Sequence, residues 1–151
     1  MTEKKRKIIP PVYLLTTLVL MWVTYRFLPL YVFIHAPWRY AGVLVTLTGI
    51  AMAAYSAGLF KKAETGIVPF DEATTLVTGG LYRYTRNPMY LGMIVMLLGV
   101  AVLFGNAGSL LPIPLFILVI RNNFVLGEER FLETAFGQQY VSYKSTVRRW
   151  I

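Results

Sequence analysis

Long apolar segments, separated by short polar stretches, constrain the fold of this chain more than any other feature. Four such segments are present: Val12–Ile34, Tyr40–Phe60, Pro88–Phe104 and Leu110–Leu126. Inside a bilayer every backbone N–H and C=O must be paired within the protein, so apolar segments of this length are expected to be helices. The sequence predicts an all-α, polytopic integral membrane protein of about four transmembrane helices, the last two forming a helical hairpin.

The composition agrees with a single membrane domain over residues 1–151. Hydrophobic residues make up 56% of the chain and the mean hydropathy is +0.57, more apolar side chain than a water-soluble domain of this size can bury. The formal net charge is +8. Because the basic residues flank apolar segments, we expect them to bind anionic lipid headgroups. We expect no nucleic-acid partner.

Cysteine and histidine usage excludes several kinds of site. The chain has no cysteine, so disulfides, thiolate metal sites and a catalytic thiol are excluded. The single histidine, His35, falls in a short turn between apolar segments, which excludes a histidine metal cluster and a histidine-based triad. We predict that the protein holds no metal.

The polar stretches divide the chain further. We expect a basic arm over residues 1–9, the first two helices within 12–60, a long cytoplasmic loop over 61–87, the helical hairpin over 88–126 and an amphipathic interfacial tail over 127–151. With four crossings, every Lys and Arg except Arg26 and Arg39 lies on one side of the membrane. The positive-inside rule makes that side cytoplasmic, in an inner or plasma membrane. Both termini and any chemistry are then expected to face the cytoplasm.

The segment Leu76–Tyr90 concentrates polar and aromatic residues before the third apolar segment. Its Asn87-Pro88 step is typical of a helix N-cap followed by proline in the first turn. This step on its own only begins a helix. With Arg83 and Arg86 nearby, the same helix start also favours an anionic group such as a carboxylate or phosphate.

Tyrosines and a pair of acids complete the candidate site. Tyr82 and Tyr90 belong either to an interfacial aromatic belt or to a pocket whose ring faces attract an onium cation. Glu128 and Glu129 either open a solvated helix or bind ribose hydroxyls or an ammonium group. Together these groups match S-adenosylmethionine, which carries a carboxylate, an ammonium, a sulfonium and ribose hydroxyls, although other cationic cofactors satisfy the same pattern.

Three stretches in the C-terminal half carry a family resemblance. They are Thr74–Gly92 (TTLVTGGLYRYTRNPMYLG), Glu128–Leu132 (EERFL) and Phe136–Ile151 (FGQQYVSYKSTVRRWI). In content, order and spacing the chain resembles the membrane methyltransferases of the isoprenylcysteine carboxyl methyltransferase and phospholipid methyltransferase superfamily. The resemblance implies a polytopic helical fold and a methyltransferase that binds S-adenosylmethionine at the cytoplasmic side and methylates a lipid or lipid-like acceptor.

The resemblance also implies which residues bind the cofactor, while it assigns no catalytic residue. The implied cofactor-binding residues are Thr74, Thr75, Leu76, Val77, Tyr82, Asn87, Pro88, Met89, Tyr90, Glu128 and Glu129. Arg83 and Arg86 are added as electrostatic support on charge alone.

Two positions differ from the isoprenylcysteine enzymes and bear on the acceptor. Those enzymes have histidine where this chain has Asn87, and a substrate-related arginine where it has Phe124. Arg121, one turn earlier, is an alternative substrate contact. The Arg-Asn-Pro form is more similar to bacterial relatives, so the acceptor, the methylated atom and the oligomeric state stay open. Two alternatives are also open: a membrane reductase related to sterol reductases that uses NADPH, and a non-catalytic membrane protein.

Overall fold

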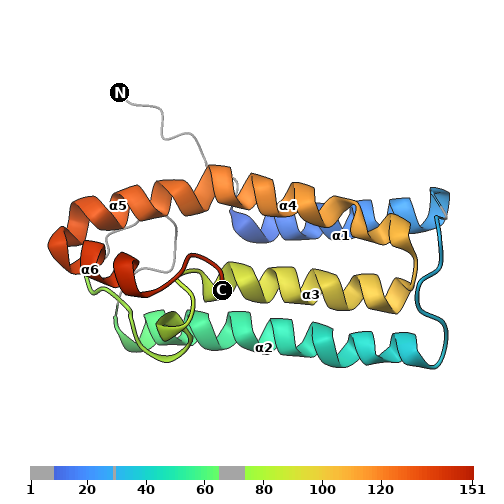
Figure 1. Ribbon diagram of the computed structural model, residues 1–151, viewed down its shortest axis with the longest axis horizontal. Helices are drawn as coiled ribbons and strands as arrows, with labels where there is room; N and C mark the ends of the chain where they lie inside the picture. Colours follow the sequence, from blue (N-terminus) through green and yellow to red (C-terminus); the bar gives the residue numbers. More distant parts are fainter. Residues whose placement is uncertain (1–8, 29, 65–73) are drawn as a thin grey trace.

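Helices make up nearly all of the regular structure in the computed structural model, which describes residues 9–28, 30–64 and 74–151. The long helices are α1 (Pro10–Phe27), α2 (Ala41–Lys62) and α3 (Pro88–Phe104), followed by α4 (Pro112–Ile120) and α5 (Leu126–Phe136), with the shorter α6 (Gln138–Thr146) near the C-terminus. α1, α2, α3 and the α4–α5 stretch lie side by side and run alternately in opposite directions (Figure 1). The predicted all-helical fold is confirmed. The basic arm up to residue 8 and residues 65–73 of the loop lie outside the described residues.

Local sequence explains where α3 begins and ends. Pro88 occupies the first turn, where its missing N–H breaks no helical hydrogen bond. At the other end Gly105 has φ +67°, and its N–H donates to the Ala101 carbonyl, so the left-handed conformation that glycine tolerates ends the helix. The predicted bounds of this helix are confirmed.

The sequence predicted that the first apolar segment is helical up to Ile34, but the helix ends earlier. α1 ends at Phe27, and the chain beyond it crosses to the turn that follows α3. There Phe33 N–H donates to the Gly105 carbonyl at 3.0 Å, and Asn106 Nδ2 donates to the Leu30 carbonyl at 3.0 Å. Partners from another part of the chain therefore replace helical hydrogen bonds over these apolar residues.

The fourth apolar segment also differs from its expected end at Leu126. α4 passes through a π-turn, η4 (Arg121–Val125), directly into α5. The first ten residues assigned to the interfacial tail, 127–136, therefore extend this helix, with Glu128 and Glu129 in the first turn of α5. The remaining tail folds back toward the start of α3 (Figure 1).

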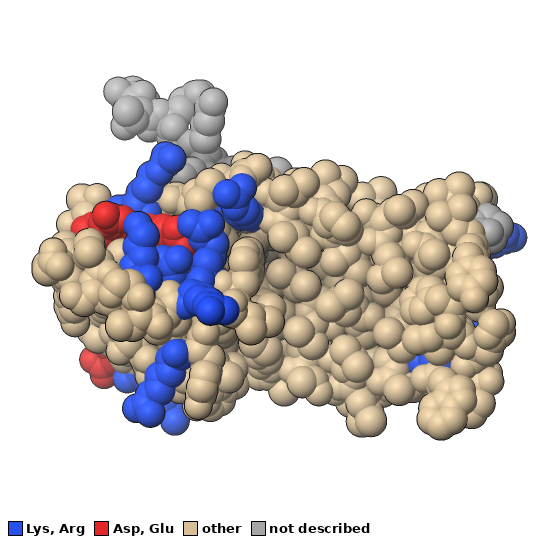
Figure 2. Space-filling model, in the orientation of Figure 1, with Lys and Arg blue, Asp and Glu red and all other residues tan. Residues whose placement is uncertain are grey.

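Among the described residues, two helical stretches are long and apolar enough to cross a membrane: Trp38–Lys62 and Ala107–Phe136. α3 is a shorter apolar helix of 17 residues. Charged side chains gather at the end of the bundle that carries α6, whereas the middle of the face shown carries almost no charged side chains (Figure 2). Arg26 and Arg39 lie at the opposite end, in the last turn of α1 and just before α2.

α3 is the central helix, and its contact with α2 is built on glycine. Gly42 and Gly49 of α2 are buried and face Gly99 and Gly92 of α3. A Cβ built on Gly49 would lie 2.6 Å from the Gly92 carbonyl oxygen, closer than carbon and oxygen can pack. Small residues at such positions let the two backbones touch. The opposite side of α3 packs Leu97 and Ala101 into the apolar core with α1 and α4.

This interface predicts opposite effects for the same substitution at two positions of α2. Gly49→Ala should lower the free energy of unfolding by roughly 1–3 kcal/mol, because the new methyl group forces α2 and α3 apart. Gly58→Ala should leave it unchanged or raise it by about 0.5–1 kcal/mol, since no described residue lies within 4 Å of a Cβ there. Thermal unfolding of both variants in one detergent, followed by circular dichroism, checks this. Equal stability of the two variants would contradict the close packing.

Candidate active site at the charged end

Tyr90 and Glu128 form the best-defined polar contact between helices at the charged end. Tyr90 lies in the first turn of α3, and Glu128 in the first turn of α5. The Tyr90 hydroxyl donates a 2.6 Å hydrogen bond to Glu128 Oε1, a length typical of a hydroxyl bonded to a carboxylate. Tyr90 is buried. Two of the predicted residues, 38 positions apart, are thus brought together.

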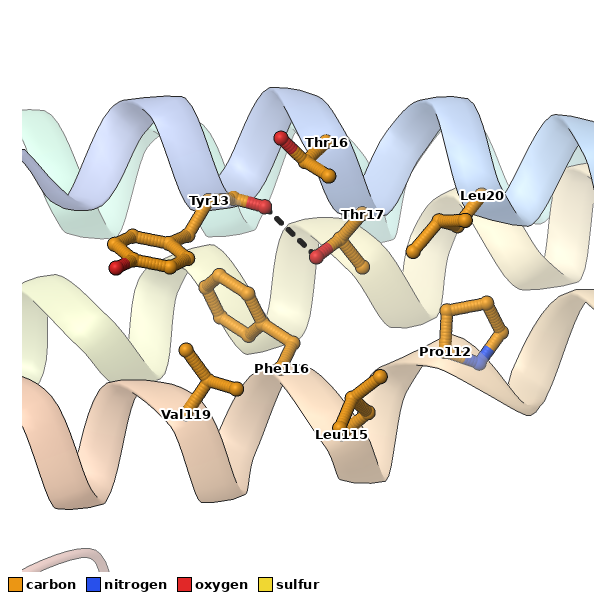
Figure 3. Close-up of a pocket in the computed structure, with 8 residues that line it drawn as sticks. All are labelled: Tyr13, Thr16, Thr17, Leu20, Pro112, Leu115, Phe116 and Val119. Atoms are coloured by element: carbon orange, nitrogen blue, oxygen red, sulfur yellow. Dashed lines mark hydrogen bonds between the residues drawn. The ribbon is translucent and has the colours of Figure 1, made fainter. Parts of the chain in front are cut away.

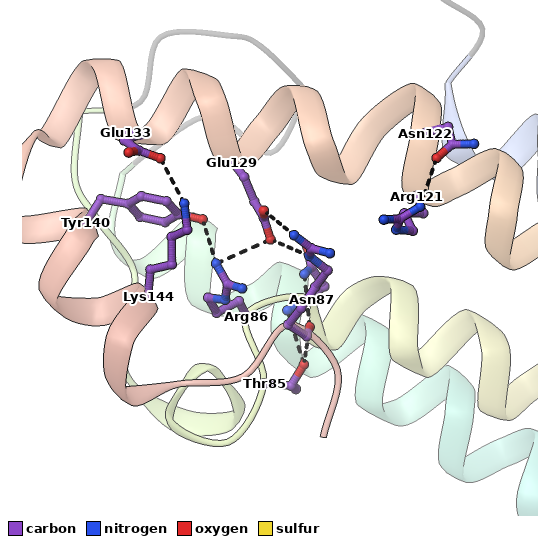
Figure 4. Close-up of polar contacts among 10 residues, drawn as sticks. Thr85, Arg86, Asn87, Arg121, Asn122, Glu129, Glu133, Tyr140 and Lys144 are labelled. Atoms are coloured by element: carbon purple, nitrogen blue, oxygen red, sulfur yellow. Dashed lines mark hydrogen bonds and ion pairs between the residues drawn. The ribbon is translucent and has the colours of Figure 1, made fainter.

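Glu129 has different partners from its neighbour. The Arg149 guanidinium donates to both of its oxygens, from Nε to Oε1 at 2.8 Å and from Nη2 to Oε2 at 2.9 Å. Arg86 Nη1 lies 3.3 Å from the same Oε1, and the cluster is drawn in Figure 4. Glu129 is 8% exposed. Its carboxylate therefore joins the loop before α3, α5 and the C-terminal tail.

The Glu129 contact stabilises the guanidinium of Arg149, which is charged at any physiological pH. Its hydrogen bonds to Glu129 raise the pKa of the Arg149 guanidinium above an already high value, against a smaller opposing effect of burial. A bidentate arginine–carboxylate pair fixes orientation as well as distance. The tail is therefore held at a defined position relative to α5.

Backbone contacts attach the same tail to the start of α3. The Arg149 carbonyl accepts hydrogen bonds from Thr85 Oγ1 at 3.1 Å and from Asn87 Nδ2 at 3.0 Å. The Arg148 carbonyl accepts from the Arg86 N–H at 3.0 Å. Asn87 does stand at the N-cap position, but its side chain makes no capping hydrogen bond. Its amide instead binds the tail, so the expected side-chain cap is absent.

Tyr82 is held in the short helix η2 (Gly80–Arg83). Its ring packs edge-on against Phe60, with centroids 5.5 Å apart, and its carbonyl accepts a 2.7 Å hydrogen bond from the Tyr143 hydroxyl. Burial raises the pKa of the Tyr82 phenol, and the neighbouring Tyr143 and Glu128 raise it further. Tyr82 is therefore a neutral residue that lines the charged end with an aromatic face.

The other predicted residues lie at varied positions around this cluster. Pro88 is buried and Met89 half-buried at the start of α3; Thr74 and Thr75 are exposed, while Leu76 and Val77 are half-buried. Arg83 is exposed on η2. Arg121 donates to Asn122 Oδ1 at 3.4 Å on the π-turn, away from the Glu129 cluster (Figure 4).

Sequence reasoning assigned no role to Arg149, Thr85 or Tyr143, which all contribute to this end of the molecule. The only signal was the similarity of the tail as a whole, since nothing in the spacing pairs Arg149 with an acid 20 residues earlier. Among the described residues, no cluster of three His, Asp or Glu is arranged to hold a metal ion. The chemistry available is a carboxylate bonded to a phenol, a buried guanidinium and a helix N-terminus.

Several curated proteins are similar to part of this chain. An uncharacterized protein from Haemophilus influenzae is 41% identical over 63 residues, covering 42% of this chain and all of that protein. Protein-S-isoprenylcysteine O-methyltransferase from Schizosaccharomyces pombe is 36% identical over 72 residues, covering 48% of this chain and 30% of the yeast protein. The corresponding enzyme A of Arabidopsis thaliana is 31% identical over 80 residues, covering 53% and 41%.

A solved structure shares the fold. The eukaryotic intramembrane Ras methyltransferase, an isoprenylcysteine carboxyl methyltransferase, superposes with a TM-score of 0.65 at 21% identity, over 91% of this chain and 50% of that chain. The chain thus spans half or less of the length of these named enzymes. At this identity the match shows the fold, that of a polytopic membrane protein.

A family model matches well over half of the chain. The model describes phospholipid methyltransferases and aligns with residues 38–139, which include the start of α3 and the Glu128 and Glu129 pair of α5. The chain belongs to the phospholipid methyltransferase family.

Proposed function

We propose that this protein is an S-adenosylmethionine-dependent methyltransferase whose cofactor binds at the charged end of the bundle. The observation that carries the proposal is the Tyr90–Glu128 hydrogen bond, at 2.6 Å, between two stretches that the family match includes. A neutral phenol fixes the orientation of a largely enclosed carboxylate there. Such a group is suited to bind ribose hydroxyls or an ammonium group.

The groups at this end fit the charges of the cofactor. Glu128 accepts from Tyr90 through one oxygen, and no hydrogen bond from the described residues reaches the other. The Arg86 side chain is 9% exposed, and its Nε has no hydrogen-bond partner among the described residues. An unpaired buried donor beside a helix N-terminus is suited to a carboxylate. The aromatic faces of Tyr82 and Tyr90 are suited to a sulfonium.

We assign the two adjacent acids different roles. Glu128 is the cofactor contact, whereas Glu129 is already engaged by two guanidinium groups and holds the walls of the site together. The surrounding contacts are proposed from Thr74–Val77, Asn87, Pro88 and Met89, with Arg83 as electrostatic support. No residue is assigned as a catalytic acid or base.

The reaction itself needs little acid–base chemistry. The cofactor supplies an activated methyl group, and transfer requires the nucleophile, methyl carbon and sulfur to be in line. The protein contributes orientation through Tyr90 and Glu128. The tail that covers the start of α3 excludes water, which strengthens the electrostatic contacts beneath it.

An apolar pocket between α1 and α4 supports a lipid or lipid-like acceptor that enters from the bilayer. Tyr13 and Thr17 of α1 face Pro112 and Phe116 of α4 across a volume of about 100 Å³ (Figure 3). The Thr17 hydroxyl donates its hydrogen bond to the Tyr13 carbonyl, so the pocket walls are effectively apolar.

Aromatic rings lead from this pocket toward the proposed cofactor site. The Tyr13 ring meets Phe124 edge-on at 5.6 Å, and Phe124 in turn lies 6.5 Å from the Tyr90 ring, between centroids. Phe124 is buried and provides no charge for an acidic acceptor, and Arg121 bonds to Asn122 instead. These contacts favour a neutral acceptor over a prenylated-protein carboxylate.

The orientation of the protein in its membrane follows from charge. The basic residues gather at the end that carries the site (Figure 2), so we propose four crossings of an inner or plasma membrane, with that end and both termini in the cytoplasm.

Cofactor binding tests the proposal. Calorimetry on detergent-purified protein should detect micromolar S-adenosylhomocysteine or S-adenosylmethionine binding, and Tyr90→Ala and Glu128→Ala should weaken it at least tenfold by removing the carboxylate or its support. The control Tyr84→Ala removes an exposed tyrosine and should bind normally. No binding by folded wild type overturns the proposal, and NADPH binding measured in parallel would favour the reductase alternative.

Substitution of Glu128 and substitution of Glu129 should have different effects on cofactor binding and on stability. Glu128→Gln should weaken cofactor binding with little change in unfolding temperature. Glu129→Gln should lower the unfolding temperature and speed proteolysis of the C-terminal tail, because breaking a buried ion pair costs on the order of 3–5 kcal/mol, less here since Arg149 is partly exposed. Thermal melts, limited proteolysis and calorimetry on both variants make the comparison. Equal changes in cofactor affinity, unfolding temperature and proteolysis for the two variants would contradict separate roles of Glu128 and Glu129.

A further inference from the structure

The residues after α6 lie across the start of α3 without regular secondary structure. α6 ends at Thr146, and Val147 has φ −116° and ψ 130°, so the helix stops there. Residues 147–151, called the latch segment below, then run back to the start of α3 (Figure 1). Their backbone carbonyls accept hydrogen bonds from the Arg86 N–H and from the Asn87 amide. The latch segment therefore forms one wall of the charged end.

The groups assigned to the cofactor are enclosed behind this wall. Tyr90 is 5% exposed and Asn87 8% exposed, and the Arg86 side chain is 9% exposed. Asn87 and Arg86 are also the residues that bond to the latch segment. A ligand reaches buried groups from water only when the chain that covers them moves aside. Exchange of the cofactor therefore requires movement at this wall.

Two side chains hold the latch segment in place. The Arg149 guanidinium donates to both oxygens of Glu129, at 2.8 and 2.9 Å. Trp150 is half-buried and packs against the apolar core that includes Tyr90. The Arg149 side chain is 30% exposed, so water competes for its ion pair. Because a segment held by few buried apolar contacts opens at a lower free energy than packed helices do, this wall opens without unfolding of the bundle.

We propose that residues 147–151 are a latch that releases to let the cofactor enter and leave, and that the Arg149–Glu129 ion pair keeps it closed. The part that concerns the cofactor rests on the proposed function, whereas the opening of the segment does not. Arg86 Nη1 lies 3.3 Å from Glu129 Oε1, so the carboxylate keeps one cationic partner when Arg149 leaves. Opening therefore breaks the contacts of the latch segment and leaves the loop before α3 joined to α5.

Exchange rates of Arg149→Gln test the proposal, with Arg148→Gln as the matched control. Arg148 is exposed, and its substitution removes the same charge one residue earlier. Arg149→Gln should raise both the association and the dissociation rate constants of S-adenosylhomocysteine at least threefold in stopped-flow measurements, because the latch is open for a larger fraction of the time. Arg148→Gln should leave both unchanged. An association rate constant of Arg149→Gln at or below that of wild type overturns the latch, because a side chain that only shapes the bound site acts on dissociation.

Locking the segment closed gives the opposite result and leaves Arg149 intact. The chain has no cysteine, so Tyr84→Cys with Arg148→Cys creates a unique thiol pair. Both side chains are exposed, and the Arg148 carbonyl bonds to the N–H of Arg86, two residues after Tyr84. Linking the pair with a short bis-maleimide should slow dissociation of preloaded S-adenosylhomocysteine, and its association with empty protein, at least tenfold. The unlinked double variant should match wild type. Equal rates before and after cross-linking would overturn the latch.

Tryptophan fluorescence without cofactor keeps this test separate from the proposed function. The chain has three tryptophans, so Trp22→Phe with Trp38→Phe leaves Trp150 as the only one. In this background acrylamide should quench Trp150 more strongly in Arg149→Gln than in Arg148→Gln, because the open latch exposes the indole ring to water. If wild type binds no cofactor while this difference holds, only the proposed function is overturned. Equal quenching in the two variants contradicts the role of the ion pair and overturns the latch.

Discussion

The charged end of this molecule depends on the burial of the Glu129 carboxylate. A carboxylate removed from water is costly unless it is paired and hydrogen-bonded. Arg149 supplies that pairing from the C-terminal tail, and Arg86 supplies it from the loop before α3. Satisfying one charge thus requires three segments to meet: the loop before α3, the first turn of α5 and the C-terminal tail. The Tyr90–Glu128 contact lies next to this junction, because Glu128 precedes Glu129 in the first turn of α5. The position of Glu128 therefore depends on the contacts that hold Glu129.

The membrane explains why most of the charged side chains lie at one end of the bundle. Backbone groups within the apolar part of the bundle must be paired internally, which the long helices achieve. α3 can serve as a rigid support because glycines bring its backbone against α2, while its other side packs on α1 and α4. The position of Tyr90, one turn into α3, is therefore fixed by packing along the full length of the helix. Irregular backbone is restricted to the ends, where water or the tail can satisfy it.

Sequence predicted those features that local chemistry determines. The bounds of α3 follow from Pro88 and Gly105. The end of α1 could not be predicted, because residues 30–34 are apolar and yet bond to the turn that follows α3. The sequence predicted Glu128 and Glu129 just beyond the fourth helix, since charge usually marks the end of an apolar helix. The π-turn that continues this helix into α5 has no sequence signature.

The site shows the same division between local and distant causes. Asn87 has the sequence of an N-cap, but the Arg149 carbonyl competes for its amide. Tyr90 and Glu128 were predicted to share a site, and they do contact each other, whereas the pairing of Glu129 with Arg149 depends on how the tail folds back. Contacts between residues this far apart follow from the fold, which the family resemblance anticipated only in outline.

Locating the cofactor tests the central claim most directly. Methyl-labelled S-adenosylmethionine would be cross-linked by ultraviolet light to the purified protein, and the labelled peptides mapped by mass spectrometry. We expect label within residues 74–90 and 126–133, displaced by excess S-adenosylhomocysteine. Displaceable label at the opposite end of the bundle, in residues 28–40 or 105–111, or no displaceable label on a folded protein, would contradict the account.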